Sequence, residues 1–211
     1  MSNYSKKDLD FFANKTLENY DSKNPSIIFK EKIKITNDDA LLIQSNVAEL
    51  RKKRGEEIAG YKIGCVSKDT QKKMGFTQPA CGYLWKNELY NSGVVLNKKN
   101  YSNPAMEAEF GIILNRDINP ELSSFDYILE SIEAIYPLIE IHNLIFHGDE
   151  PYGAELLTNN AIHAGVVLGL KTKFPTNKLE TDLKLIYDNE IMDTWVNKKW
   201  PIDMLSEVNW L

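Results

Sequence analysis

Two stretches of the sequence place acidic residues among apolar neighbours. Glu107 and Glu109 lie two residues apart in NPAMEAEFGIIL (103–114), and Glu140 lies in YPLIEI (136–141). Because side chains alternate between the faces of a strand, Glu107 and Glu109 would share one face, about 6.5 Å apart at the backbone. Like charges in an apolar setting repel and resist desolvation. A hard divalent cation, which prefers oxygen ligands, would offset both effects.

A simpler explanation exists, in which Glu107 and Glu109 lie on the solvent-exposed face of an amphipathic strand. Glu-x-Glu is a common spacing and does not decide between the two. Glu140 is harder to explain as a surface residue, since its neighbours in the sequence are apolar. On the pattern alone, a metal site and an exposed face remain alternatives.

Composition and charge narrow the classes of function. Of 211 residues, 43% are hydrophobic, which is enough for a substantial core and argues against disorder. The 30 acidic and 25 basic residues give a formal net charge of −5, so we expect no binding of nucleic acid. The two cysteines, Cys65 and Cys81, lie in no metal-binding spacing and are too few for a disulfide framework, and their small number favours a reducing compartment.

The sequence contains no signal for a membrane or for secretion. No apolar run approaches the roughly 20 residues that span a bilayer. The N-terminal MSNYSKKDLDFF has lysines but no apolar segment of the kind found in secretory signals. We therefore predict a soluble, cytoplasmic protein that makes no membrane contact.

The elements that must position these residues fall into two regions. Residues 1–55 are predicted to be helical, with a break near 21–25 and a second helix that begins at the N-cap Thr36. From residue 58 the pattern indicates short strands, joined in one place by helical spacing over 123–135. Asp188–Asn189 is predicted as a tight hairpin turn, and 201–211 as a final helix with an apolar side. The predicted strands are 58–66, 82–85, 94–96, 106–114, 136–141, 162–170, 179–187 and 190–196.

Many short strands with few helices predict a β-rich α+β fold. We expect an N-terminal helical region at 1–55 and a second region at 56–211.

Five motifs then occur in a familiar order. GYKIGCVSKDTQKKMG (60–75) resembles the GYKIG-x-TSK-x-x-Q-x-x-x-G segment of 2-oxopent-4-enoate hydratases and 4-oxalocrotonate decarboxylases. It is followed by QPACGYL, NPAMEAEFGIIL, YPLIEI and NNAIHAGVVLG. From about residue 40 to 210, the chain resembles this hydratase/decarboxylase branch of the fumarylacetoacetate-hydrolase-like enzymes, a branch associated with aromatic catabolism.

The resemblance implies a fold and a chemistry. The fold would be a mixed β-sheet that closes into an incomplete barrel, with 56–211 as the catalytic domain, and the protein would be a homo-oligomer. The cofactor would be Mg²⁺ or Mn²⁺, held by Glu107, Glu109 and Glu140. The substrate would be a small 2-oxo acid or its 2-hydroxy-2,4-dienoate form.

The resemblance also assigns roles to side chains around the metal. Lys62, in GYKIG, would hold the substrate carboxylate or transfer a proton; the alternative is a structural role in which it only balances the acidic cluster. Ser67, Gln71 and Asn160 would bind substrate. His142 and His163 are candidate acids or bases, because imidazole titrates near neutral pH, while a purely structural role for each remains open.

Three departures from the family pattern affect the chemistry. Ala80 stands where hydratases usually carry an acidic residue, and Asn159–His163 (NNAIH) replaces Asp-Asn-Ala-Ser-Ser. The family also continues beyond this C-terminus with further strands. Without them we expect an exposed sheet edge. Two explanations remain open: a neighbouring subunit completes the barrel, or the chain is a shortened, inactive relative.

Three functions follow from these observations. The leading prediction is a divalent-metal lyase, either a hydratase or a decarboxylase, that acts on a small 2-oxo acid. The second is a non-catalytic family member that serves as a binding or assembly subunit. The third is a C–C hydrolase of acylpyruvates, which is disfavoured because Val66–Asp69 lacks the histidine–glutamate pair of that branch.

Overall fold

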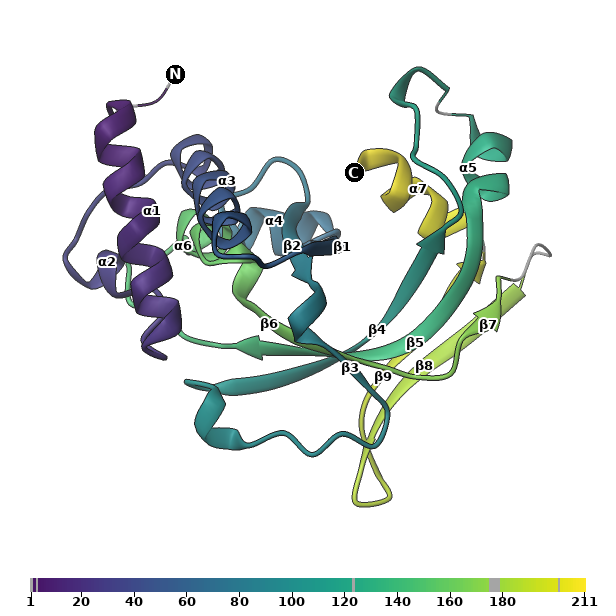
Figure 1. The fold of residues 1–211 in the computed structure, drawn as a ribbon. Coiled ribbons are helices and arrows are strands. Elements are labelled where there is room, and N and C mark those ends of the chain that lie inside the picture. The colour runs from purple at the N-terminus through teal and green to yellow at the C-terminus, as the bar shows by residue number, and fades with distance from the viewer. Residues whose placement is uncertain (1, 3, 123, 175–178, 201) are drawn as a thin grey trace. The chain divides into compact units, whose positions relative to one another are not determined.

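The computed structural model describes residues 2, 4–122, 124–174, 179–200 and 202–211 (Figure 1). The chain forms two compact units. The first consists of Met1–Tyr90, Val95–Ala105 and Ile141–Gly165. The second consists of Asn91–Val94, Met106–Glu140 and Val166–Leu211. The boundary expected at residue 55 stays a prediction.

The N-terminal helices begin and end where local signals require. α1 (Lys6–Asp21) begins at a capping box, in which the Ser5 hydroxyl accepts from the Asp8 amide and the Asp8 carboxylate accepts from the Ser5 amide. α2 (Ile27–Lys30) follows the predicted break. α3 (Asn37–Lys53) begins at Thr36, whose hydroxyl accepts from the Asp39 amide, so this predicted cap is confirmed.

Apolar side chains of the first unit gather in two clusters. One joins α1 to α3 through Leu9, Phe12, Ala13 and Ile43. The other includes residues of α3, α6 (Gly153–Thr158) and η4 (Asn160–Ile162), a 3-10-type turn whose three residues have positive φ. Its buried members are Ala40, Phe76, Ala80, Leu156, Leu157, Ala161 and Ile162.

A two-stranded sheet in the first unit carries Lys62. β1 (Ile58–Gly64) pairs antiparallel with β2 (Ala80–Trp85), and Lys62 lies opposite Gly82. Between them, α4 (Lys68–Met74) begins at Ser67, whose hydroxyl accepts from the Thr70 amide. The 3-10 helix η1 (Lys86–Glu88) follows β2 directly.

The largest sheet has the strand order β3-β6-β5-β4, with β7 paired to β5. Backbone hydrogen bonds join Asn115 to Ser131 beyond one end of β4 and β5, and Leu144 to Asn103 beyond the other. These two strands therefore run antiparallel. The strands of this sheet are β3 (Leu89–Asn91), β4 (Pro104–Leu114), β5 (Ile132–Asn143), β6 (His163–Leu168) and β7 (Thr172–Lys173).

The second unit has its own helical core. α5 (Phe125–Ser131) and α7 (Ile202–Trp210) contribute to one apolar cluster. α7 corresponds to the helix predicted near the C-terminal end of the sequence. Buried members of the cluster are Ile128, Ile132, Ile135, Phe174 and Leu205.

A separate hairpin in the second unit consists of β8 (Leu179–Tyr187) and β9 (Glu190–Trp200). Its turn residues have positive φ, 49° at Asp188 and 65° at Asn189, as a tight hairpin turn requires. The predicted turn is therefore confirmed. The remaining 3-10 turns are η2 (Lys98–Asn100) and η3 (Pro120–Leu122).

The predicted α+β class is confirmed, and the described strands form open sheets rather than a closed barrel. Two local predictions were wrong. Residues 94–96 form no strand, because the Val94 amide bonds to the Asn91 carbonyl in a turn. The helix predicted over 123–135 ends at Ser131, and Ile132 already belongs to β5. Isoleucine spacing there also fits a strand, and pairing within the sheet decides the outcome.

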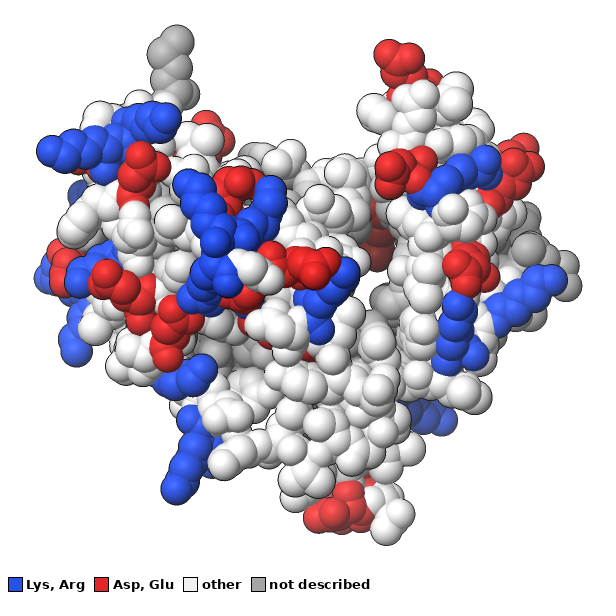
Figure 2. All heavy atoms as spheres, viewed as in Figure 1, with Lys and Arg blue, Asp and Glu red and all other residues white. Residues whose placement is uncertain are grey.

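On the face drawn in Figure 2, lysines and arginines are interspersed with acidic residues. Among the described residues, no helix has both the length and the apolar character that crossing a bilayer requires.

Candidate metal centre

Neighbouring strands bring two of the predicted carboxylates together. The hydrogen bonds that end the β4–β5 pairing set Glu107 opposite the part of β5 that carries Glu140. His142 follows two residues later on β5, so strand alternation gives it the same side as Glu140.

The acidic side chains and the imidazole form a compact donor group. Ligand atoms of Glu107, Glu140 and His142 all lie within 4.8 Å of one another. Glu140 is 1% exposed and His142 is 5% exposed, whereas Glu107 faces solvent. The two carboxylates are ligands that Mg²⁺ and Mn²⁺ favour, whereas imidazole is more typical of Zn²⁺ or Fe²⁺, so the group fits a divalent cation without fixing which one. Burial of Glu140 is consistent with this, because a buried carboxylate requires compensating charge or hydrogen bonds.

The third predicted ligand, Glu109, lies on β4 two residues beyond Glu107 and is half-buried. Alternation gives it the same side of the strand as Glu107, while Ala108 between them is buried. The compact group contains His142 in its place. A ligand role for Glu109 stays a prediction.

Lys62 lies next to His142, one of the three members of the donor group. Its side chain is buried, and the Nζ atom is 3.3 Å from Nε2 of His142. The same Nζ donates a hydrogen bond to the main-chain carbonyl of Ala161, also at 3.3 Å. The structure thus joins two of the predicted catalytic residues, Lys62 and His142.

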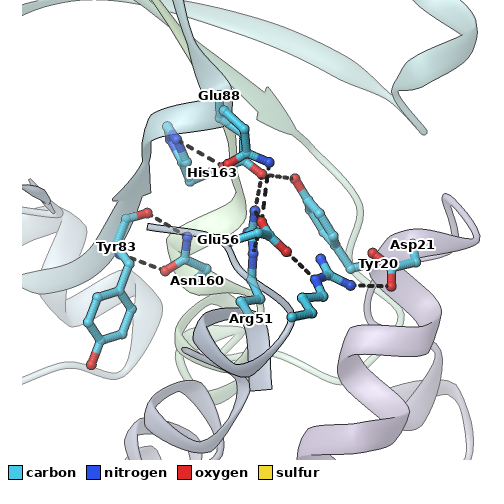
Figure 3. A network of polar contacts seen from close by, with 10 residues as sticks. Tyr20, Asp21, Arg51, Glu56, Tyr83, Glu88, Asn160 and His163 are labelled. Atoms are coloured by element: carbon cyan, nitrogen blue, oxygen red, sulfur yellow. Dashed lines mark hydrogen bonds and ion pairs between the residues drawn. The ribbon is translucent and has the colours of Figure 1, made fainter. Parts of the chain in front are cut away.

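His163 is directed into a different polar network (Figure 3). Its side chain is buried, with Nε2 at 3.8 Å from Oε2 of Glu88. Glu88 also accepts a hydrogen bond from Arg51 at 2.6 Å and one from the Tyr20 hydroxyl at 2.8 Å. Arg51 donates in addition to Glu56.

The predicted substrate-binding residues make local contacts within the first unit. Ser67 caps α4 and is exposed, whereas Gln71 is buried and donates to the carbonyl of Val66 at 3.3 Å. The amide of Asn160 pairs with the main chain of Tyr83. These contacts hold the local backbone, and substrate binding by the three residues stays a prediction.

No sequence pattern singled out the buried charged residues Arg51, Glu88 and Glu155. The Arg51 side chain is buried and lies over the Trp85 ring, with Cζ 4.1 Å from the centroid. Glu155 on α6 accepts from the amides of His147 and Gly148 at 2.7 and 2.8 Å. Glu155 could have been found as a lone acid in the apolar segment GAELLT, whereas Arg51 lies within the basic run RKKR (51–54), which gives no such signal.

Comparison with known proteins supports the motif assignment. No family model matches the sequence. A 2-keto-4-pentenoate hydratase of Burkholderia vietnamiensis is 30% identical over 130 residues, covering 62% of this chain and 50% of the relative. A 2-hydroxypent-2,4-dienoate hydratase of Pseudomonas putida is 34% identical over 109 residues, covering 51% of this chain and 49% of the relative. The chain thus spans about half the length of these curated relatives.

Solved structures show the same fold at lower identity. The 4-oxalocrotonate decarboxylase of Pseudomonas putida G7, complexed with magnesium and adipate, gives a TM-score of 0.78 at 15% identity, covering 93% of this chain and 76% of that one. Its complex with calcium and acetate gives 0.76 at 16% identity, covering 93% and 75%. By motifs, relatives and fold, this chain is similar to the hydratase/decarboxylase branch of the fumarylacetoacetate-hydrolase-like enzymes, which confirms the resemblance.

Proposed function

We propose that this chain is a divalent-metal-dependent lyase that acts on a small 2-oxo acid or its 2-hydroxy-2,4-dienoate form, with hydration ahead of decarboxylation. The observation that carries the proposal is the donor group of Glu107, Glu140 and His142. It occurs in a chain whose sequence relatives are named as a 2-keto-4-pentenoate hydratase and a 2-hydroxypent-2,4-dienoate hydratase. The metal named with the decarboxylase structure supports magnesium as the first cation to test.

Glu107, Glu140 and His142 would hold the cation, and Glu109 is proposed as a further ligand from the same side of β4. Bound Mg²⁺ or Mn²⁺ would act as a Lewis acid toward the carboxylate and 2-oxo oxygens of the substrate. The protein residues have to orient the substrate and control protons around that group. Burial of Glu140 and His142 limits the access of bulk water to this side of the site.

Lys62 is the residue best suited to substrate contact beside the metal ligands. Its Nζ is 3.3 Å from His142 and donates to Ala161, so the ammonium has a defined position rather than a free range of rotamers. A cation held there would pair with the substrate carboxylate, and the same Nζ would carry a proton to or from the dienol. Because Ala80 offers no acid for water activation and His142 is assigned to the cation, we assign proton transfer to Lys62.

The decisive experiment follows the ultraviolet absorbance of 2-hydroxypenta-2,4-dienoate with Mg²⁺, with Mn²⁺ and with EDTA. We expect metal-dependent loss of absorbance in the wild type. Lys62→Met should lower turnover on the order of a hundredfold or more, the usual contribution of a positioned acid or base. Lys86→Met is the matched control, because Lys86 is 61% exposed and pairs only at the surface with Glu57.

Product analysis separates the lyase reactions, because hydration adds water and decarboxylation of an oxalocrotonate releases CO₂. Full turnover by Lys62→Met would remove that residue from the mechanism. A wild type inactive with both metals would favour the non-catalytic family member. Homo-oligomeric assembly, completion of the barrel by another subunit and a cytoplasmic location stay predictions of the resemblance.

A further inference from the structure

The connection between α6 and β6 has an unusual backbone. Three consecutive residues with a Cβ adopt positive φ, namely Asn160 at 56°, Ala161 at 51° and Ile162 at 56°. The left-handed region is disfavoured for such residues, and a β-branched isoleucine is among the least suited to it. A conformation of this kind persists only where surrounding contacts enforce it.

Side-chain and main-chain contacts hold this left-handed turn, residues 160–162, against β2. The Tyr83 amide donates to Oδ1 of Asn160 at 2.7 Å, and Nδ2 of Asn160 donates to the Tyr83 carbonyl at 2.8 Å (Figure 3). At Gly82 the approach is closer still, because a Cβ there would lie 2.7 Å from the Asn160 carbonyl oxygen. The turn therefore fits on β2 only where the strand carries no side chain.

This attachment point is directly beside Lys62. Gly82 is the residue that pairs with Lys62 across β1 and β2. From the turn, the carbonyl of Ala161 accepts the hydrogen bond from Lys62 Nζ at 3.3 Å. The same turn therefore contacts Lys62 in two ways. It packs against Gly82, the strand partner of the Lys62 backbone, and its Ala161 carbonyl accepts from the Lys62 ammonium.

We propose that the left-handed turn fixes the position of the Lys62 ammonium. Asn160 and Gly82 are therefore positioning residues for Lys62. The proposal deepens the proposed function and rests on it for the catalytic role of Lys62. A connection that only linked α6 to β6 would need neither the strained backbone nor the two-point attachment to Tyr83. Glycine would serve there without strain.

The first test is kinetic. Asn160→Gly removes both side-chain bonds to Tyr83 while leaving the left-handed conformation accessible. We expect kcat/KM for the dienoate to fall at least tenfold in the wild-type background. In a Lys62→Met background the same change should lower it less than twofold, because residues that act as one unit are non-additive. Gly82→Ala, which drives a methyl group against the Asn160 carbonyl, should behave in the same way.

The second test does not depend on activity. A double-mutant cycle of Lys62→Met and Asn160→Gly, measured by urea unfolding, should show at least a threefold coupling in the unfolding equilibrium constant. Asn159→Gly is the matched control, because Asn159 also bonds distant main chain, at the Ser26 amide, but makes no such link to Lys62. Its effects should add to those of Lys62→Met in both tests.

The outcomes separate the two proposals. A wild type without turnover but with coupling between Lys62 and Asn160 would overturn the lyase and retain the positioning. An active wild type in which Asn160→Gly and Lys62→Met combine additively, in rate and in stability, would overturn the positioning and leave the lyase intact.

Discussion

Arg51 shows how a single buried charge is tolerated in the first unit. Its guanidinium donates to Glu88 at 2.6 Å and through Nε to Glu56 at 2.8 Å. It also lies over Trp85, at 4.1 Å from the ring centroid. A buried charge without such partners would cost several kcal/mol, so removal of any one partner should lower the free energy of unfolding. The network links α1, through Tyr20, to α3 and η1.

Glu56 makes this network sensitive to acid. Burial raises the pKa of Glu56, but hydrogen bonds from Arg51 and Arg54 outweigh burial and hold the pKa below its ordinary value. A carboxyl with a lowered folded-state pKa stabilises the protein above its unfolded pKa, and this stabilisation is lost as the pH falls through the folded-state pKa. The wild type should therefore lose stability as the pH falls below about 4.5.

We predict that Glu56→Gln lowers the free energy of unfolding at pH 7 by about 1–3 kcal/mol, since it removes a charged hydrogen-bond acceptor. Its stability should then depend less on pH between 5 and 3 than that of the wild type. Urea unfolding at several pH values measures both effects. Glu57→Gln is the neighbouring control, because Glu57 is 68% exposed. Parallel pH curves for the wild type and Glu56→Gln would contradict the assignment.

At the scale of elements, the sequence predicted what local signals determine. Thr36 and the Asp188–Asn189 turn were found because caps and tight turns depend on a few adjacent residues. The segment 132–135 was assigned to a helix, because isoleucines at that spacing fit either period and only pairing in the sheet decides. The left-handed turn was not predictable either, since contacts with β2, far away in the sequence, impose it.

Among the described residues, Leu205 is the buried residue of α7 in the apolar cluster of the second unit, and Met204 and Val208 of the same helix pack against that cluster. Leu205 is 1% exposed and lies in one cluster with Ile128, Ile132 and Phe174. We predict that Leu205→Ala destabilises this core by about 2–5 kcal/mol, through lost burial and the cavity left behind. Hydrogen exchange of α5 and α7 measures the effect locally.

Asn209→Ala supplies the control on the same helix, because Asn209 is exposed. Exchange in α5 should stay at the wild-type rate in this variant. Because alanine has a higher helix propensity than leucine or asparagine, unchanged or slower exchange in Leu205→Ala would contradict the role of Leu205 packing.

At the scale of the whole molecule, the candidate site depends on contacts between segments distant in sequence. The acidic pattern on β4 and β5 predicted Glu107 and Glu140, but alternation alone could not rank Glu109 against His142 as the third donor. That choice depends on the pairing of β4 with β5. The contact between Lys62 and His142 spans 80 positions and no local pattern encodes it.

A bound cation should stabilise the folded protein in addition to supporting catalysis, because a ligand that binds only the folded state shifts the unfolding equilibrium. At a metal concentration a hundredfold above Kd the gain is about 2.7 kcal/mol. For a chain of this length we predict that Mg²⁺ or Mn²⁺ raises the midpoint of thermal unfolding by roughly 5–10 °C after EDTA treatment. Glu140→Gln should abolish the shift. Glu133→Gln, on the same strand but 48% exposed, should retain it. Because the measurement needs no substrate, an unchanged midpoint in the wild type would refute the metal site whatever reaction the protein catalyses.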